Sequence, residues 1–130
     1  MFAAAAWFPV VAWVDVLVVA TASWRWLDAL GAALLVGVLA QAIADSLGYL
    51  APQFRPLGAE RDAVRRRSET SALGRAVAWN LGTLLLVAAA MAGGGAIWGW
   101  VAKVGWAFVV TSAVTQAILI ASVRRVHAAA

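Results

Sequence analysis

Acidic and amide side chains inside apolar stretches are the residues of this sequence whose types and spacing could support chemistry. Asp15 lies in the apolar stretch 3–21, and Asp45 follows Gln41 by four residues in the stretch 27–50. Asn80 and Gln116 lie in two later apolar stretches. An ionisable residue inside a membrane span is a functional candidate by default, because its desolvation is costly. These five residues form the candidate intramembrane polar site.

Asp15 has no lysine or arginine in its own apolar stretch that could neutralise it. As a functional group it would bind a proton or a cation. As a structural group it would accept hydrogen bonds from another helix and fix the register of packing. The sequence leaves both interpretations open.

Gln41 and Asp45 are one helical turn apart and therefore share a helix face. Asn80, Thr115 and Gln116 are expected at a similar depth. Together with Gln41 and Asp45, these three residues could form one polar cluster. Interhelical hydrogen bonds, worth roughly 1 kcal/mol each, are the interpretation that we favour. A substrate or ion site that opens to the cytoplasm is the alternative.

Residues for other kinds of chemistry are scarce in this chain. It has no cysteine, and its single histidine, His127, lies in the C-terminal tail. One histidine without further ligands does not define a metal or haem site. No Ser-His-Asp arrangement and no glycine-rich phosphate loop is evident. We therefore expect no enzyme activity, no cofactor and no metal.

Composition indicates a membrane protein. Hydrophobic residues make up 65% of the 130 residues and charged residues 12%, about half the charged fraction of a soluble domain. So small a globule could not hide this much apolar surface. The net charge of +4 is concentrated at segment ends, which favours anionic lipid headgroups over nucleic acid as the partner.

Four apolar stretches predict an all-α, integral membrane four-helix bundle of two hairpins, one transmembrane domain over 1–130. A hydrocarbon core of roughly 30 Å needs about 20 helical residues. No basic residue precedes the first stretch, and Pro9 and Asp15 interrupt it, so we interpret it as a retained helix and not a signal peptide. We expect Pro9 to kink this helix and Gly99 to mark the second hairpin turn. The predicted spans are 3–21, 27–50, 73–98 and 100–123.

The polar segment 53–72 is predicted to be a cytoplasmic loop. Eight of the ten lysine and arginine residues lie between positions 53 and 75 or at positions 124 and 125. By the positive-inside rule, this loop and both termini face the cytoplasm. From Gly58 onward the segment is expected to be helical, with Arg65 paired to Glu69 four residues later.

The arginines of this region are candidates for contact with lipid phosphates or with a partner protein. A solvated connector that sets topology is the simpler interpretation, and a docking surface is the sharper one. The candidates are Arg61, Arg65, Arg66, Arg67 and Arg75.

A pattern of paired tryptophans occurs twice, 74 residues apart. Trp24 and Trp26 begin one copy, and Trp98 and Trp100 begin the other, each followed by an aliphatic residue. Either the two hairpins are an internal 2+2 repeat, or both turns independently placed tryptophan at the membrane interface, where it is enriched. In both cases these tryptophans mark the outer face.

The loop segment 59–68, AERDAVRRRS, resembles a motif of small, functionally uncharacterised prokaryotic four-span membrane proteins. Their loop has the pattern D-E-R-x-x-x-I-x-x-x-A. Glu60 and Arg61 match, Val64 replaces the isoleucine, Ser68 the alanine and Ala59 the aspartate. The resemblance implies a prokaryotic integral membrane protein of the cell inner membrane and supplies no activity.

Three function classes remain. The first is a non-enzymatic accessory, assembly or regulatory subunit that associates with a membrane protein or with further copies of itself. The second is a small oligomeric transporter or channel that uses Asp15 or Asp45. An enzyme acting on lipid ranks last, because no catalytic constellation is present.

Overall fold

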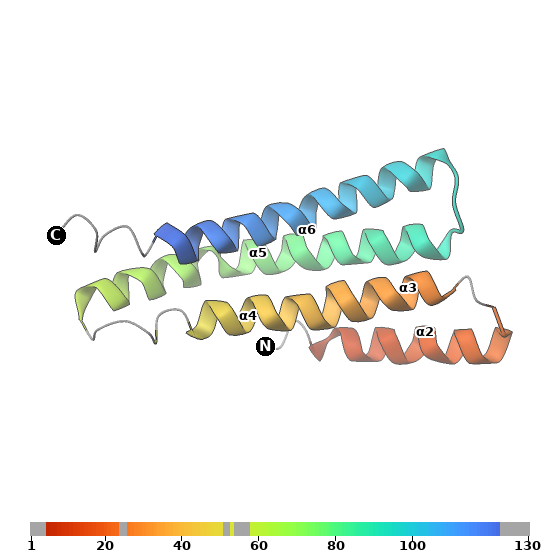
Figure 1. The fold of residues 1–130 in the computed structure, drawn as a ribbon, viewed down its shortest axis with the longest axis horizontal. Helices are drawn as coiled ribbons and strands as arrows, with labels where there is room; N and C mark the ends of the chain where they lie inside the picture. Colours follow the sequence, from red (N-terminus) through yellow and green to blue (C-terminus); the bar gives the residue numbers. More distant parts are fainter. Residues whose placement is uncertain (1–4, 24–25, 51–52, 54–57, 123–130) are drawn as a thin grey trace.

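The chain is all-α where the structure, a computed structural model, describes it: residues 5–23, 26–50, 53 and 58–122. Four helical rods make up this part of the chain (Figure 1). The second rod has three consecutive segments, α3, η2 and α4. The elements are α2 (Trp7–Thr21), α3 (Leu27–Gly31), η2 (Ala32–Ala40), α4 (Gln41–Leu50), α5 (Ala59–Met91) and α6 (Ala96–Ser122).

Three of these rods are long and apolar enough to cross a membrane, as expected for a multi-pass membrane protein. They cover Leu27–Leu50, Glu69–Met91 and Ala96–Ala121. The first predicted span differs, because α2 has 15 residues and a rise of 1.5 Å per residue gives it a length of about 22 Å. Pro9 lies in the first turn of α2, where a helix needs no backbone donor.

The second rod has the predicted bounds, but its middle is wider than an α-helix. Ala32–Ala40 form a π-helix, η2, whose hydrogen bonds join residues five apart. The indole Nε1 of Trp79 on α5 donates to the carbonyl oxygen of Val36 at 2.9 Å. A hydrogen bond from another helix thus reaches the backbone inside the π-helical segment.

The second hairpin turn lies at residues 92–95, so the prediction of a turn at Gly99 is wrong. Gly93, Gly94 and Gly95 have φ values of 74°, 107° and 111°, which side-chain-bearing residues rarely adopt. These glycines end α5 and start α6 at Ala96. Gly99 lies inside α6, and the predicted third and fourth spans shift accordingly.

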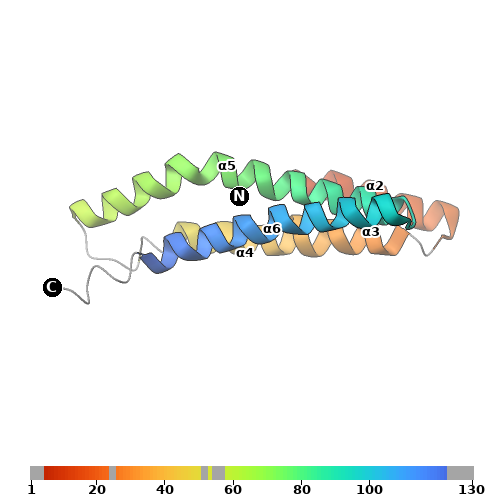
Figure 2. The ribbon, with the colours of Figure 1, turned by 90° about the horizontal axis from the view of Figure 1, so that it is seen from above.

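The rods run antiparallel to their neighbours in the chain, so the bundle has two distinct ends (Figure 1). We call the end with Ala22, Trp26 and residues 92–95 the turn end, and the end with Leu50, Gly58 and Ala121 the loop end. Helix α5 begins at Ala59, as expected for a helical loop segment, and at the loop end it projects beyond α4 and α6 (Figures 1 and 2).

The closest helix contact joins α5 and α6. A Cβ atom added at Gly82 would lie 2.7 Å from the carbonyl oxygen of Gly105, and one added at Gly105 would lie 2.9 Å from that of Gly82. Only glycine permits the two backbones to approach so closely. This contact fixes α6 on α5.

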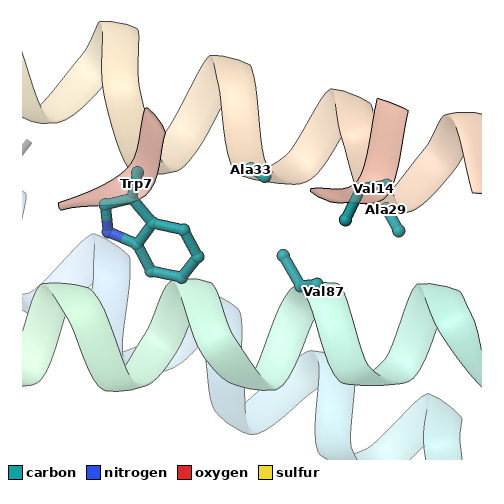
Figure 3. Packing of buried hydrophobic residues seen from close by; sticks show 5 residues of the cluster. All are labelled: Trp7, Val14, Ala29, Ala33 and Val87. Carbon is teal, nitrogen blue, oxygen red and sulfur yellow. The ribbon is translucent and has the colours of Figure 1, made fainter. Parts of the chain in front are cut away.

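Two small apolar clusters form the core. The first joins α2 and α3–η2 to α5 through Trp7, Val14, Ala29, Ala33 and Val87 (Figure 3). The second joins η2, α5 and α6 through Val36, Trp79, Leu86 and Val109. Most large apolar side chains lie outside these clusters and are exposed, as expected where lipid is the solvent.

Candidate functional site

A line of residues at four-residue spacing organises the second rod. Ala29, Ala33, Gly37 and Gln41 are buried, and Asp45 is half-buried. In an α-helix four residues advance by slightly more than one turn, so such a line drifts around the axis. The wider turns of η2 reduce this drift, which keeps the line facing the neighbouring helices along most of the rod.

The small residues of this line make room for Trp7. A Cβ atom at Gly37 would lie 2.7 Å from Trp7 Cδ2 and 3.2 Å from Thr83 Cγ2. Trp7 Nε1 donates to Asn80 Oδ1 at 2.6 Å, and Asn80 Nδ2 donates to the carbonyl oxygen of Ala76 at 2.7 Å. Trp7 thereby joins α2, η2 and α5 halfway along the second rod.

The polar residues of the line lie on the loop-end side of Trp7. Asp45 is close enough to Arg75 on α5 for its negative charge to act on the guanidinium. Arg75 Nη1 donates to Ser71 Oγ, one turn earlier on α5. A carboxylate and a guanidinium from two helices, both half-buried, therefore lie within electrostatic range of each other.

Helix α6 completes this arrangement. Ser112 Oγ donates to the carbonyl oxygen of Arg75 at 3.4 Å, and Gln116 Nε2 donates to that of Ala44 at 3.4 Å. The resulting loop-end polar cluster takes residues from α4, α5 and α6: Asp45, Ser71, Arg75, Ser112 and Gln116, with Gln41 one turn before Asp45 on the same face of α4.

Gln41 is the most buried member of the cluster, with 2% of its surface exposed. Its Oε1 atom is buried and accepts no hydrogen bond from any residue that the structure describes. A buried amide oxygen without a partner costs about 1–3 kcal/mol. Buried polar atoms of this kind are commonly satisfied by an ordered water or by a ligand.

The predicted polar residues do not form one cluster. Gln41, Asp45 and Gln116 lie in the loop-end polar cluster, whereas Asn80 binds Trp7. Thr115 Oγ1 donates to the carbonyl oxygen of Thr111 in its own helix.

Asp15 lies apart from the other predicted polar residues. Its side chain is exposed on α2. Trp7 lies beside Gly37, and α2 runs antiparallel to the second rod. Asp15 follows Trp7 by as many residues as Ala29 precedes Gly37, so Asp15 is about level with Ala29, near the turn end. Its carboxylate is thus nearer to one end of the bundle than its place in the apolar stretch suggested.

Ser71, Arg75 and Ser112 were not foreseen as members of one cluster. Arg75 was grouped with the loop arginines because of its charge, but it lies six residues inside the apolar helix Glu69–Met91. The apolar residues that follow Arg75 place it within a candidate membrane span, and this distinguishes it from the arginines of the polar loop. Neither serine has a sequence signal of this kind.

The other arginines lie on the projecting part of α5. Arg61 Nη2 donates to Gln53 Oε1 at 2.6 Å, and Arg66 is exposed. The predicted pair is present: Arg65 Nε donates to Glu69 Oε1 at 2.8 Å, and this carboxylate raises the pKa of Arg65. The side chain of Arg67 lies outside the described part.

The described tryptophans of the repeated pattern lie at the turn end. Trp26 directly precedes α3, and Trp98 and Trp100 lie in the first two turns of α6, where both are exposed. The ammonium group of Lys103 lies 4.5 Å from the centre of the Trp100 ring. Trp24 lies outside the described residues.

Comparison with known proteins does not identify the chain. No family model matches it, and no curated protein or solved structure shows significant similarity to it.

Proposed function

We propose that this protein is a four-span membrane protein that works as a non-enzymatic accessory, assembly or regulatory subunit of a membrane complex. The observation that carries this proposal is the projecting start of α5. Its described side chains Asp62, Arg65, Arg66 and Glu69 are exposed, and the helix extends beyond the ends of α4 and α6 (Figure 2). A charged helix that projects from an apolar bundle is suited to dock another protein.

The proposed orientation places the loop end and both termini in the cytoplasm. The concentration of arginine at the loop end and the exposed tryptophans at the turn end both support it, since basic residues favour the cytoplasmic side and tryptophans favour the interfaces. The start of α5 would then project into the cytoplasm. Anionic headgroups would lie beside its arginines.

A 2+2 arrangement of two similar hairpins is part of the same proposal. Trp26, directly before α3, and its counterpart Trp100, in the second turn of α6, both lie near the start of the returning helix of a hairpin. The short α2 would be the counterpart of the much longer α5. The resemblance of the loop motif to small prokaryotic four-span proteins also supports this plan.

The docking proposal is tested by neutralising the projecting helix. The variant Arg65→Gln/Arg66→Gln/Arg67→Gln should lose at least about tenfold of the co-purifying partner in mild detergent, since charged residues of an interface contribute to complementarity and on-rate. Lys103→Gln, which removes a charge at the turn end, is the control and should retain the partner. Equal retention by the triple variant and the control would contradict the proposal.

Transport is the second candidate, favoured by the proximity of Asp45 to Arg75 inside a candidate span. An oligomer would be needed to enclose a pathway. Asp45→Asn or Asp15→Asn should then abolish proton or ion flux in liposomes while the protein still folds. Unchanged flux in both variants would exclude these residues from transport.

A further inference from the structure

Two opposite charges near the turn end face outward from the bundle. Asp15 is exposed on α2, and Lys103 is exposed on α6. Among the described residues, the Asp15 carboxylate has no hydrogen bond and no ion pair. The ammonium group of Lys103 lies over the ring of Trp100 and has no acidic partner in the described part of the chain. Both groups are thus open to a charged partner from outside this molecule.

The outer helices α2 and α6 can be placed at a common level through their closest contacts. A Cβ atom at Gly37 would lie 2.7 Å from Trp7 and 3.2 Å from Thr83. A Cβ atom at Gly82 would lie 2.7 Å from the carbonyl oxygen of Gly105. Since Gly82 and Thr83 are neighbours in α5, Trp7 on α2 and Gly105 on α6 lie at about the same distance from the turn end.

Measured from this level, the two charges lie at a similar depth. Asp15 follows Trp7 by eight residues toward the turn end, about 12 Å at 1.5 Å per residue. Lys103 lies two residues from Gly105 in the same direction, and its ammonium group reaches one turn further, to Trp100. Helical side chains lean toward the start of their own helix, so Lys103 leans toward the turn end and Asp15 leans away from it. These shifts bring the ammonium group and the carboxylate to about the same depth.

Each of the two charges belongs to an otherwise apolar stripe of exposed residues, with successive spacings of four, three and four. The stripe on α2 consists of Phe8, Ala12, Asp15 and Val19, and the stripe on α6 consists of Lys103, Ala107, Val110 and Val114. Residues at this spacing share one helix face, and the same spacing lets two helices pack along their length. The α6 stripe faces away from α5, because it lies about half a turn from the buried Gly105 and Val109.

The two stripes lie on opposite sides of the molecule. Helices α2 and α6 are the outermost rods, with the second rod and α5 between them (Figure 1), so the stripes do not meet within one copy. In two copies with the same orientation in the membrane, α2 of one copy and α6 of the other run antiparallel. With Asp15 beside Lys103, the ring of Phe8 leans toward the loop end and comes beside the small side chain of Ala107.

The carboxylate gains most from such a contact. A long lysine side chain can extend toward the headgroups, whereas Asp15 is short and leans toward the middle of the bundle, where an unpaired charge is costly. We propose that copies of this chain associate in the membrane through α2 of one copy and α6 of the next, joined by an ion pair between Asp15 and Lys103 of the neighbouring copy.

Charge reversal tests the ion pair. Asp15→Lys and Lys103→Asp each place like charges in the contact, so the dissociation constant of the oligomer in mild detergent should rise at least about tenfold in each variant. The double variant Asp15→Lys/Lys103→Asp restores opposite charges and should return to within about threefold of wild type. Asp28→Lys, which reverses an exposed acid in the first turn of α3, is the matched control and should associate like wild type.

Sedimentation of the purified variants measures association, and circular dichroism shows that each variant is folded. Equal weakening by Asp15→Lys and Asp28→Lys would mean that total charge and not the pair is responsible, and would overturn the proposal. A folded double variant that associates no better than the two single variants would overturn it as well.

Cross-linking in vesicles tests the same contact with both charges in place, and it decides if a charge-reversed variant does not fold. The chain has no cysteine, so Phe8→Cys and Ala107→Cys variants with different tags can be reconstituted together and oxidised. Their mixed disulfide should form at least about fivefold more than that between Phe8→Cys and Leu84→Cys, since Leu84 is exposed on α5 next to the level of Thr83. Equal yields would overturn the proposal.

The association rests on the membrane placement of the proposed function but not on its docking partner, so the two can fail separately. Lys103→Gln should weaken self-association and still retain the partner, because the projecting start of α5 lies at the other end of the bundle (Figure 2). Unchanged self-association of Lys103→Gln would contradict the ion pair, whatever happens to the partner.

Discussion

Trp7 and Asn80 join helices that are far apart in the chain, through a hydrogen bond of 2.6 Å from the indole Nε1 to the amide Oδ1. Asn80 is held by its own donation to the carbonyl oxygen of Ala76 at 2.7 Å. The amide therefore has a fixed orientation before it accepts the indole proton. This contact is the most specific link between α2 and α5.

A double-mutant cycle with Trp7→Phe and Asn80→Leu measures this link. Each single substitution removes one partner, and the coupling between them should be about 0.6 kcal/mol, the average of interhelical hydrogen bonds in membrane proteins, and at most about 1.7 kcal/mol. Unfolding in detergent followed by circular dichroism provides the free energies. A coupling of zero would show that the two side chains do not act on each other.

Gly37→Ala should destabilise the fold by about 1–3 kcal/mol, because the new methyl group would overlap the Trp7 ring. The shortest distance from this Cβ position to the ring is 2.7 Å. Gly31→Ala is the matched control in the same rod, since its Cβ position has nothing within 4 Å. The control should be stabilised by about 0.5–1 kcal/mol, because alanine favours the helix more than glycine does.

Thermal unfolding of both variants by circular dichroism distinguishes the two effects. A lower midpoint for Gly37→Ala together with a raised midpoint for Gly31→Ala is expected. Raised midpoints for both would mean that Trp7 does not pack against Gly37.

Gly94→Ala should destabilise the second hairpin by about 1–2 kcal/mol, because alanine is strained in a left-handed conformation. The φ of Gly94 is 107° and its Cβ position is open, so strain alone causes the loss. Gly99→Ala, in the regular part of α6, should stabilise the protein by about 0.5–1 kcal/mol. The opposite ranking in a detergent unfolding titration would restore Gly99 as the turn.

Residues close in sequence were the predictable part of this molecule. The length of the apolar stretch predicts the rod Leu27–Leu50. The four-residue spacing of Arg65 and Glu69 predicts their ion pair. The second turn was misplaced because the tryptophan pattern was preferred over three consecutive glycines, although left-handed backbone angles are a property of glycine.

The candidate site was less predictable, because its contacts depend on the relative rotation and shift of the helices. Asp45 and Gln41 share a face by spacing, but no periodicity indicates that Arg75 lies opposite them. The donation from Trp7 to Asn80 likewise needs α2 to be shifted toward the turn end. Hydropathy does not encode either of these displacements.

Helix α5 has the mechanical properties of a lever. It is continuous over 33 residues, about 50 Å at 1.5 Å per residue, and no glycine or proline interrupts it between Ala59 and Leu73. Gly74 is its first weak point, one residue before Arg75. A force on the arginine-rich end would bend the helix most easily there, next to the guanidinium on which the charge of Asp45 acts.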